Sequence, residues 1–169
     1  KSPHSFNNKF GVPLSISNLK RDTEYGVFEI GMDKRGEIDN LSRIVLPEIA
    51  IITNISKAHL KNFKNLTGIA NAKAEIINNI SEGGNIILNK DDKFHNFLTN
   101  KAIKKGINVT SFSCKKNADI FLISRKKIKN FYRLRVNVKN KIFYFDVKYS
   151  TNNFINNILA CISVISTLN

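Results

Sequence analysis

Several features that would place this chain in a broad class at once are missing from its sequence. It has no run of about 18 apolar residues, so we expect no membrane-spanning helix. The first residues, KSPHSFNN, lack the apolar segment of a secretory signal, and the cytoplasm is therefore the expected location. Neither of the phosphate-binding loops GxxxxGK(S/T) and GxGxxG occurs. A nucleotide site in this chain would therefore have to be formed by other residues.

Cysteine is scarce, and acidic residues are outnumbered by basic ones. Cys114 and Cys161 have neither CxxC nor Cys/His metal-ligand spacing, so we interpret them as free thiols in a reducing compartment. The net charge of +14 suggests nucleic-acid binding, but the basic residues are spread over the whole chain. The chain is also rich in Lys, Asn, Ile and Phe, a pattern that genomic base-composition bias produces. We expect no nucleic-acid partner and keep a basic nucleic-acid-binding module as the alternative from another class.

The apolar pattern predicts an α/β fold with a mostly parallel sheet flanked by helices. With 169 residues, 42% of them hydrophobic, the chain can bury one substantial core. Buried parallel strands are predicted at residues 25–31, 49–52, 85–88 and 109–112. Helices are predicted at residues 13–19, 37–46, 66–80 and about 91–104, the last with Asp91 or Asp92 as its N-cap.

The pattern changes in the last third of the chain. Three strands follow one another without helices, at residues 120–124, 131–138 and 142–147. Their alternation of apolar and polar residues predicts antiparallel pairing, with a hairpin turn at Lys139-Asn140-Lys141. An apolar helix is predicted from residue 152 onward. We therefore expect an α/β core at 1–113, a small antiparallel β extension at 119–148 and a helix at 152–169 that returns to the core.

Residues 51–76 form the strongest candidate site. They comprise a strand end, a polar loop with His59, and a helix that carries Lys73 and Glu75. Sites in open α/β sheets lie outside the carboxyl ends of the strands. Glu29 interrupts another apolar run, where it is either a site residue or one half of a structural ion pair with Lys or Arg. A single His is more often structural than a ligand, and a Lys on a helix is more often solvated than functional. The spacing of these residues alone therefore does not decide whether they form a functional site.

The residue strings resemble the central ATPase domain of the Mur ligases. The run VFEIGMDKRGEIDNLSRIVLPEIAIITNISKAHLKNFKNLTGIANAKAEI follows the family's E-(L/I)-G, GEI, P-x-x-A-x-(I/V)-T-N, A-H-L and I-A-x-A-K-x-E-I motifs in order and spacing. Upstream, NNKFGVPLS resembles the NNxxGxP segment, and NFINNILA near the end resembles the H-x-x-x-N-x-L-A helix. Because several independent motifs agree over nearly the whole chain, the resemblance is specific.

The resemblance implies a magnesium site. Glu29 and His59 would hold the Mg²⁺ ion that bridges the ATP phosphates and the substrate carboxylate. Lys73 matches the lysine that CO₂ converts to a carbamate in this family. Carbamylation turns a cation into a carboxylate-like anion, which can bind a second Mg²⁺ ion.

The resemblance also implies the nucleotide contacts. Asn157 matches the asparagine that contacts the adenine of ATP, and Asn8 lies in the loop on the nucleotide side. Asn54 ends its strand beside the same site. All three are expected to contribute to ATP binding.

The reaction implied by the family forms an amide bond in two steps. A substrate carboxylate attacks the γ-phosphate of ATP to give an acyl phosphate and ADP, and an amine then displaces phosphate. Both steps gather negative charge, which Mg²⁺ and positive donors stabilise. Within the family the motifs favour addition of D-alanyl-D-alanine to a UDP-MurNAc-tripeptide in peptidoglycan precursor synthesis. Another Mur-type ligase or a polyglutamate-synthase-type ligase is the alternative.

The sequence departs from the family pattern at four positions. They are Lys34, Lys61, Thr151 and Asn153, which stand where the family usually has His, an acidic residue, Gly and His. The family's glycine-rich phosphate loop would precede Lys1, and we expect its N-terminal and C-terminal domains to lie outside this chain as well. We therefore expect a partial central domain, monomeric and inactive as a ligase by itself.

Overall fold

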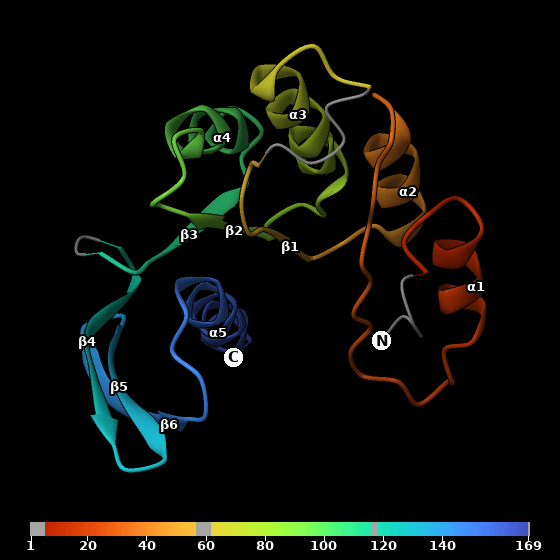
Figure 1. Ribbon diagram of the computed structural model, residues 1–169. Helices are drawn as coiled ribbons and strands as arrows, with labels where there is room; N and C mark the ends of the chain where they lie inside the picture. The colour runs from red at the N-terminus through yellow and green to blue at the C-terminus, as the bar shows by residue number, and fades with distance from the viewer. Residues whose placement is uncertain (1–5, 57–61, 116–117, 169) are drawn as a thin grey trace.

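One mixed β-sheet forms the centre of the chain (Figure 1). The computed structural model describes residues 6–56, 62–115 and 118–168. The strands are β1 (Ile49–Ile52), β2 (Asn85–Asn89), β3 (Asn108–Ser113), β4 (Ile120–Ile128), β5 (Phe131–Val138) and β6 (Lys141–Val147). They lie side by side in chain order, with parallel pairing from β1 to β4 and antiparallel pairing from β4 to β6. The predicted fold class, a mostly parallel α/β sheet with a small antiparallel extension, is confirmed.

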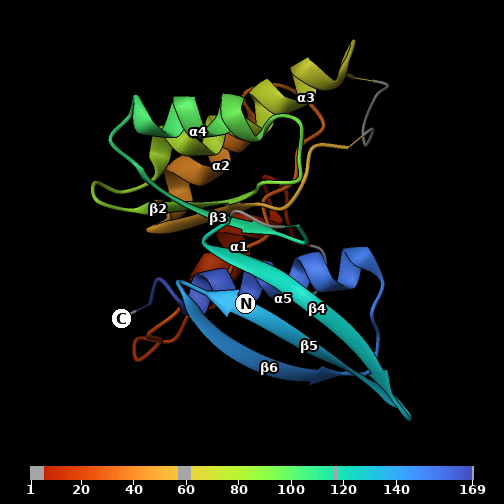
Figure 2. The same ribbon diagram turned by 90° about the vertical axis from the view of Figure 1, so that its left-hand side faces the viewer.

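Helices cover both faces of the parallel strands. The helices of the chain are α1 (Gly11–Ser17), which packs against α2, then α2 (Glu37–Val45), α3 (Leu66–Lys73), the 3₁₀ helix η1 (Ala74–Asn79), α4 (His95–Ile103) and α5 (Asn152–Ile165). Figure 2 shows α2, α3 and α4 on one face, and α5 on the other, between the parallel strands and the β4–β6 extension. Within the described residues, none of these helices has the length and apolar character that crossing a membrane requires.

The central strand β2 contributes to a separate core on each face. Successive strand residues point to opposite sides, so Ile86 and Leu88 pack beneath α3 and α4 while Ile87 packs against α5. The extension closes the second core, because Leu134 and Val136 of β5 join the same cluster. This two-sided burial fixes the register of β2, whose carboxyl end carries part of the site described below.

The hairpin between β5 and β6 has the predicted turn. Lys139 and Asn140 have φ angles of 47° and 70°, the left-handed conformation that a tight turn requires. The side chain of Asn137 accepts a hydrogen bond from Asn140 N at 3.1 Å. The two cysteines are free thiols, as predicted. The division of the chain into domains stays a prediction.

The strand predicted at residues 25–31 is wrong. This segment has no regular secondary structure, and its side chains Tyr25 and Val27 are 61% and 66% exposed. A buried strand needs a hydrogen-bonded neighbour, and β1 ends the described sheet without pairing to this segment. The segment is instead tied by Gly31 N, which donates to Asn7 O at 2.7 Å. Apolar composition alone does not reveal whether such a neighbour exists.

The helix predicted at residues 66–80 is interrupted. It is α-helical to Lys73 and continues as the 3₁₀ helix η1. In the 3₁₀ stretch, the side chains of Glu75 and Asn79 bind groups of α2. These tertiary contacts are not contained in the apolar periodicity of the segment.

Replacing Ile87 with alanine is expected to lower the free energy of unfolding by about 2–5 kcal/mol, because it leaves a cavity in the core under α5. Ile103→Ala is the matched control, since Ile103 is 62% exposed on α4 and its loss should change stability by less than about 1 kcal/mol. Urea unfolding followed by circular dichroism measures both. Equal effects of the two substitutions would contradict this placement of the core.

Candidate functional site

A cavity of about 200 Å³ lies beside the carboxyl end of β1. It is bordered by α2, α3 and the extended segment that precedes α2. Its lining residues are Asn7, Glu29, Ile30, Gly31, Met32, Ile38, Ile69 and Lys73. Two of the predicted site residues, Glu29 and Lys73, are therefore brought together although 44 positions separate them in the sequence (73 − 29 = 44).

Lys73 is the last residue of α3, which places its side chain at the cavity. Asn65 is the N-cap of this helix, and its side chain accepts a hydrogen bond from Gly68 N at 2.9 Å. The amine of Lys73 is half-buried and donates to the main-chain oxygen of Asn54 at 2.9 Å. Burial lowers the pKa of Lys73 below its ordinary value, and the charge of Asp92 partly opposes this. The fraction of neutral, nucleophilic amine is thus larger than for a solvated lysine.

Glu29 is held at the cavity by an amide. Asn7 Nδ2 donates to Glu29 Oε1 at 2.8 Å. A Cβ on Gly31 would lie 3.0 Å from Asn7 Cγ, so glycine at position 31 lets the amide approach. The expectation that Glu29 sits inside a buried strand is wrong, because the residue is exposed on an extended segment. Its carboxylate is therefore accessible and oriented by a neutral partner.

Glu75 has a structural role next to the site. Its two carboxylate oxygens accept hydrogen bonds from Gly36 N at 2.9 and 3.0 Å, and Oε2 also accepts from Asp39 N at 3.3 Å. These are amides at the start of α2, where a negative charge is favoured. Gly36 itself has a φ of 86° and precedes the helix as its N-cap. Glu75 thus fixes α2, which forms one wall of the cavity, against η1.

The three predicted nucleotide contacts lie on different elements of the structure. Asn8 lies in the turn before α1, whose N-cap position is Phe10, and its Oδ1 accepts from Phe10 N at 3.1 Å and from Gly11 N at 3.0 Å. Asn157 is an exposed residue of α5, on the opposite face of the sheet from α3. Asn54 meets Lys73 through its main-chain oxygen. His59, together with Lys61, lies outside the described residues.

Sequence reasoning misassigned the polar turn after β2. The sequence predicts Asp91 or Asp92 as the N-cap of the following helix, but the N-cap position of α4 is Phe94. Asp92 Oδ2 instead accepts from Ile55 N at 2.6 Å, and Asp91 Oδ2 accepts from Cys114 N at 2.7 Å. The signal was present, because acidic residues at the carboxyl end of a central parallel strand lie next to the loops that follow both neighbouring strands.

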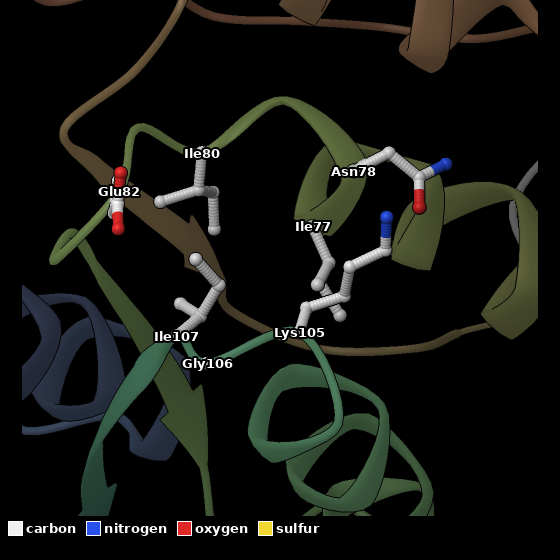
Figure 3. A pocket seen from close by; sticks show the side chains of 7 residues that line it. All are labelled: Ile77, Asn78, Ile80, Glu82, Lys105, Gly106 and Ile107. Carbon is white, nitrogen blue, oxygen red and sulfur yellow. The ribbon is translucent and has the colours of Figure 1, made fainter.

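A second hollow lies at the other end of the sheet (Figure 3). It has a volume of about 330 Å³ and is found near the start of β2 and β3. Its lining residues are Ile77, Asn78, Ile80, Glu82, Lys105, Gly106 and Ile107. It holds none of the predicted site residues. Among the residues that the structure describes, no group of three or more His, Cys, Asp and Glu side chains could hold a metal ion.

Comparison with known proteins gives a consistent result. Residues 1–165 match the family described as the Mur ligase middle domain. The UDP-N-acetylmuramoyl-tripeptide–D-alanyl-D-alanine ligase of Rickettsia prowazekii is 34% identical over 167 residues, which cover 97% of this chain and 37% of that protein. The ligase of the same name from Bacillus subtilis is 44% identical over 92 residues, covering 54% of this chain and 20% of that protein.

Solved structures agree with the sequence comparison. MurF from Acinetobacter baumannii superposes with a TM-score of 0.90 at 27% identity, covering 99% of this chain and 36% of that one. The MurF ligase of Thermotoga maritima, solved in complex with ADP, gives a TM-score of 0.88 at 25% identity, covering 99% of this chain and 38% of that one. The chain spans about a third of the length of these relatives.

Proposed function

The chain belongs to the Mur ligase middle domain family, and we propose that it is the central part of an ATP-dependent ligase that joins D-alanyl-D-alanine to a UDP-MurNAc-tripeptide. The names of the relatives support this substrate pair, and the ADP bound by the Thermotoga maritima ligase supports ATP as the energy source. We place the reaction in peptidoglycan precursor synthesis. The cytoplasm as location and a monomeric state stay predictions.

The observation that carries the proposal is the position of Lys73 in one cavity with Glu29. A neutral amine attacks CO₂ and loses a proton to become a carbamate. The lowered pKa of Lys73, caused by burial, favours the neutral amine that this reaction needs. The carbamate keeps one N–H, which can still donate to the main-chain oxygen of Asn54. Its two oxygens are then free to act as ligands.

We propose that this cavity binds a magnesium ion. Mg²⁺ prefers oxygen ligands and is usually bound by one or two carboxylates together with substrate phosphates. The Glu29 carboxylate and the carbamate of Lys73 would supply such oxygens, and Asn7 orients the first of them. His59 completes the proposed metal site as a prediction from the sequence. When bound, magnesium neutralises charge on the phosphates and on the attacking carboxylate.

In the proposed reaction, the residues of this chain act mainly by positioning ATP and the substrate carboxylate. The peptide carboxylate attacks the γ-phosphate of ATP, which yields an acyl phosphate and ADP, and the amine of D-alanyl-D-alanine displaces phosphate. In this proposal Asn157 contacts the adenine, and Asn8 and Asn54 contribute to ATP binding from other elements. The bonds of the Asn8 side chain to Phe10 N and Gly11 N support a role in shaping the loop before α1.

Product analysis of the full-length protein tests the proposal. Incubated with ATP, UDP-MurNAc-tripeptide and D-alanyl-D-alanine, it is expected to form ADP and the amide product in equal amounts, as measured by chromatography and mass spectrometry. Omission of any one substrate should abolish the amide. If the amide formed only with a different amine or a different acceptor, the protein would be another ligase of the family. Formation of neither product would contradict the proposal.

A further inference from the structure

Two side chains at the end of β2 hold the loop that follows β1. Asp92 Oδ2 accepts a hydrogen bond from Ile55 N at 2.6 Å. Asn89 Nδ2 donates to the main-chain oxygen of Thr53 at 3.1 Å. The residue between these two anchor points is Asn54, whose main-chain oxygen accepts from Lys73 Nζ. The peptide that meets the lysine is therefore fixed on both sides.

We propose that Asp92 is a positioning residue for Lys73. It holds the backbone after β1 so that the Asn54 carbonyl orients the lysine side chain at the cavity. This inference rests on the proposed function, in which Lys73 acts as a carbamate.

The chemistry of the Asp92 contacts suits this role. One carboxylate oxygen, Oδ2, binds Ile55 N in the loop after β1. The other, Oδ1, accepts from Phe94 N at 2.8 Å within the turn of Asp92 itself. Hydrogen bonds from amides to an ionised carboxylate are short and roughly twice as strong as neutral ones. The side chain of Ile55 is buried in the core under α3, so apolar packing also holds the loop that follows β1. Few degrees of freedom remain for the Asn54 carbonyl.

Asp91 offers an internal comparison. It is the adjacent residue in the same turn, is also half-buried, and also accepts from a main-chain amide. Its partners, however, lie after β3, where Oδ1 accepts from Ser113 Oγ at 2.7 Å and Oδ2 from Cys114 N at 2.7 Å. The two aspartates thus hold the loops on opposite sides of β2. Substitutions at the two positions therefore distinguish an effect on the position of Lys73 from a general destabilisation of the turn after β2.

Asp92→Ser in the full-length protein tests the inference. The serine hydroxyl can still accept from the amide two residues on, but it is too short to reach Ile55 N. We expect kcat for ligation to fall by roughly 10- to 100-fold, because misplacement of a catalytic group by about 1 Å costs this much. The KM for ATP should change by less than about twofold, as expected for an effect on catalysis rather than binding.

Hydrogen exchange supplies a readout that needs no turnover. In the Asp92→Ser variant the Ile55 amide is expected to exchange at least about tenfold faster than in the wild type, since its acceptor is lost. Asp91→Ser should leave both the Ile55 exchange rate and kcat within about threefold of the wild type, because its contacts lie on the other side of the strand. These rates are measured by mass spectrometry of peptides that contain Ile55.

Three results would overturn the inference. They are an unchanged kcat in Asp92→Ser, an unchanged exchange rate of Ile55, or equal effects of Asp91→Ser on both. If Asp92→Ser does not fold, Asp92→Asn takes its place, because asparagine keeps the shape but has one acceptor oxygen for the amides of Ile55 and Phe94 and no charge. Unchanged kcat and unchanged Ile55 exchange in that variant would also overturn the inference. A wild-type protein that forms no amide would refute the proposed function, while the exchange comparison still decides whether Asp92 holds the loop.

Discussion

Lys73→Ala is expected to lower the rate of amide formation by on the order of 1000-fold, the largest effect predicted for any substitution in this chain. The substitution removes the amine that would form the carbamate and the hydrogen bond to the Asn54 carbonyl. Without the carbamate, one anionic ligand next to Glu29 is lost. Turnover of the full-length protein, followed by ADP release and product mass, measures the effect.

A chemical rescue separates the carbamate from a simple loss of lysine. Short carboxylates such as acetate and formate can occupy the space left by the side chain, and they should restore part of the activity of Lys73→Ala. Lys104→Ala is the matched control, because Lys104 is exposed at the end of α4 and its loss should leave turnover within about twofold of the wild type. Full activity of Lys73→Ala without added carboxylate would remove Lys73 from the proposed mechanism.

Local patterns in the sequence predicted most of the fold. The helix after Gly36, the buried strands β1 to β3 and the hairpin at Lys139-Asn140 depend on periodicity, caps and turn residues, which act over a few positions. The failures have a common cause. The segment at 25–31 is apolar enough for a strand, but strand formation requires a partner, which composition does not encode.

The candidate site was predictable only in part for the same reason. Glu29 and Lys73 belong to family motifs that can be recognised in the sequence, and the structure places both at one cavity. The contacts that hold them come from residues without such a signal, since Asn7 meets Glu29 and Asp92 meets the loop after β1. These contacts join positions 22 and 37 residues apart. The Asp92 contact depends on how β1 and β2 align, which burial on both faces of β2 decides. The Asn7 contact depends instead on the main-chain bond between Gly31 N and Asn7 O.

Glu29→Gln is expected to lower turnover by roughly 100- to 1000-fold while leaving the local structure intact. Glutamine has nearly the same shape, and its side-chain oxygen can still accept the hydrogen bond from Asn7 Nδ2. The substitution therefore removes the negative charge of residue 29 while keeping the position of its side chain. If this charge binds magnesium, the concentration of Mg²⁺ needed for half-maximal activity should also rise, because a neutral amide oxygen is a weaker ligand for a hard cation.

A magnesium titration of the full-length protein measures both effects of Glu29→Gln. Glu24→Gln is the matched control, because Glu24 is an exposed glutamate of the same segment that lies outside the cavity lining. It should show wild-type turnover and wild-type magnesium dependence. If Glu29→Gln matched this control, the carboxylate would not belong to the metal site, and the hydrogen bond from Asn7 would have only a structural role. If turnover fell without any shift in magnesium dependence, the charge of Glu29 would act on the substrates directly, and the metal would have to be held by other residues.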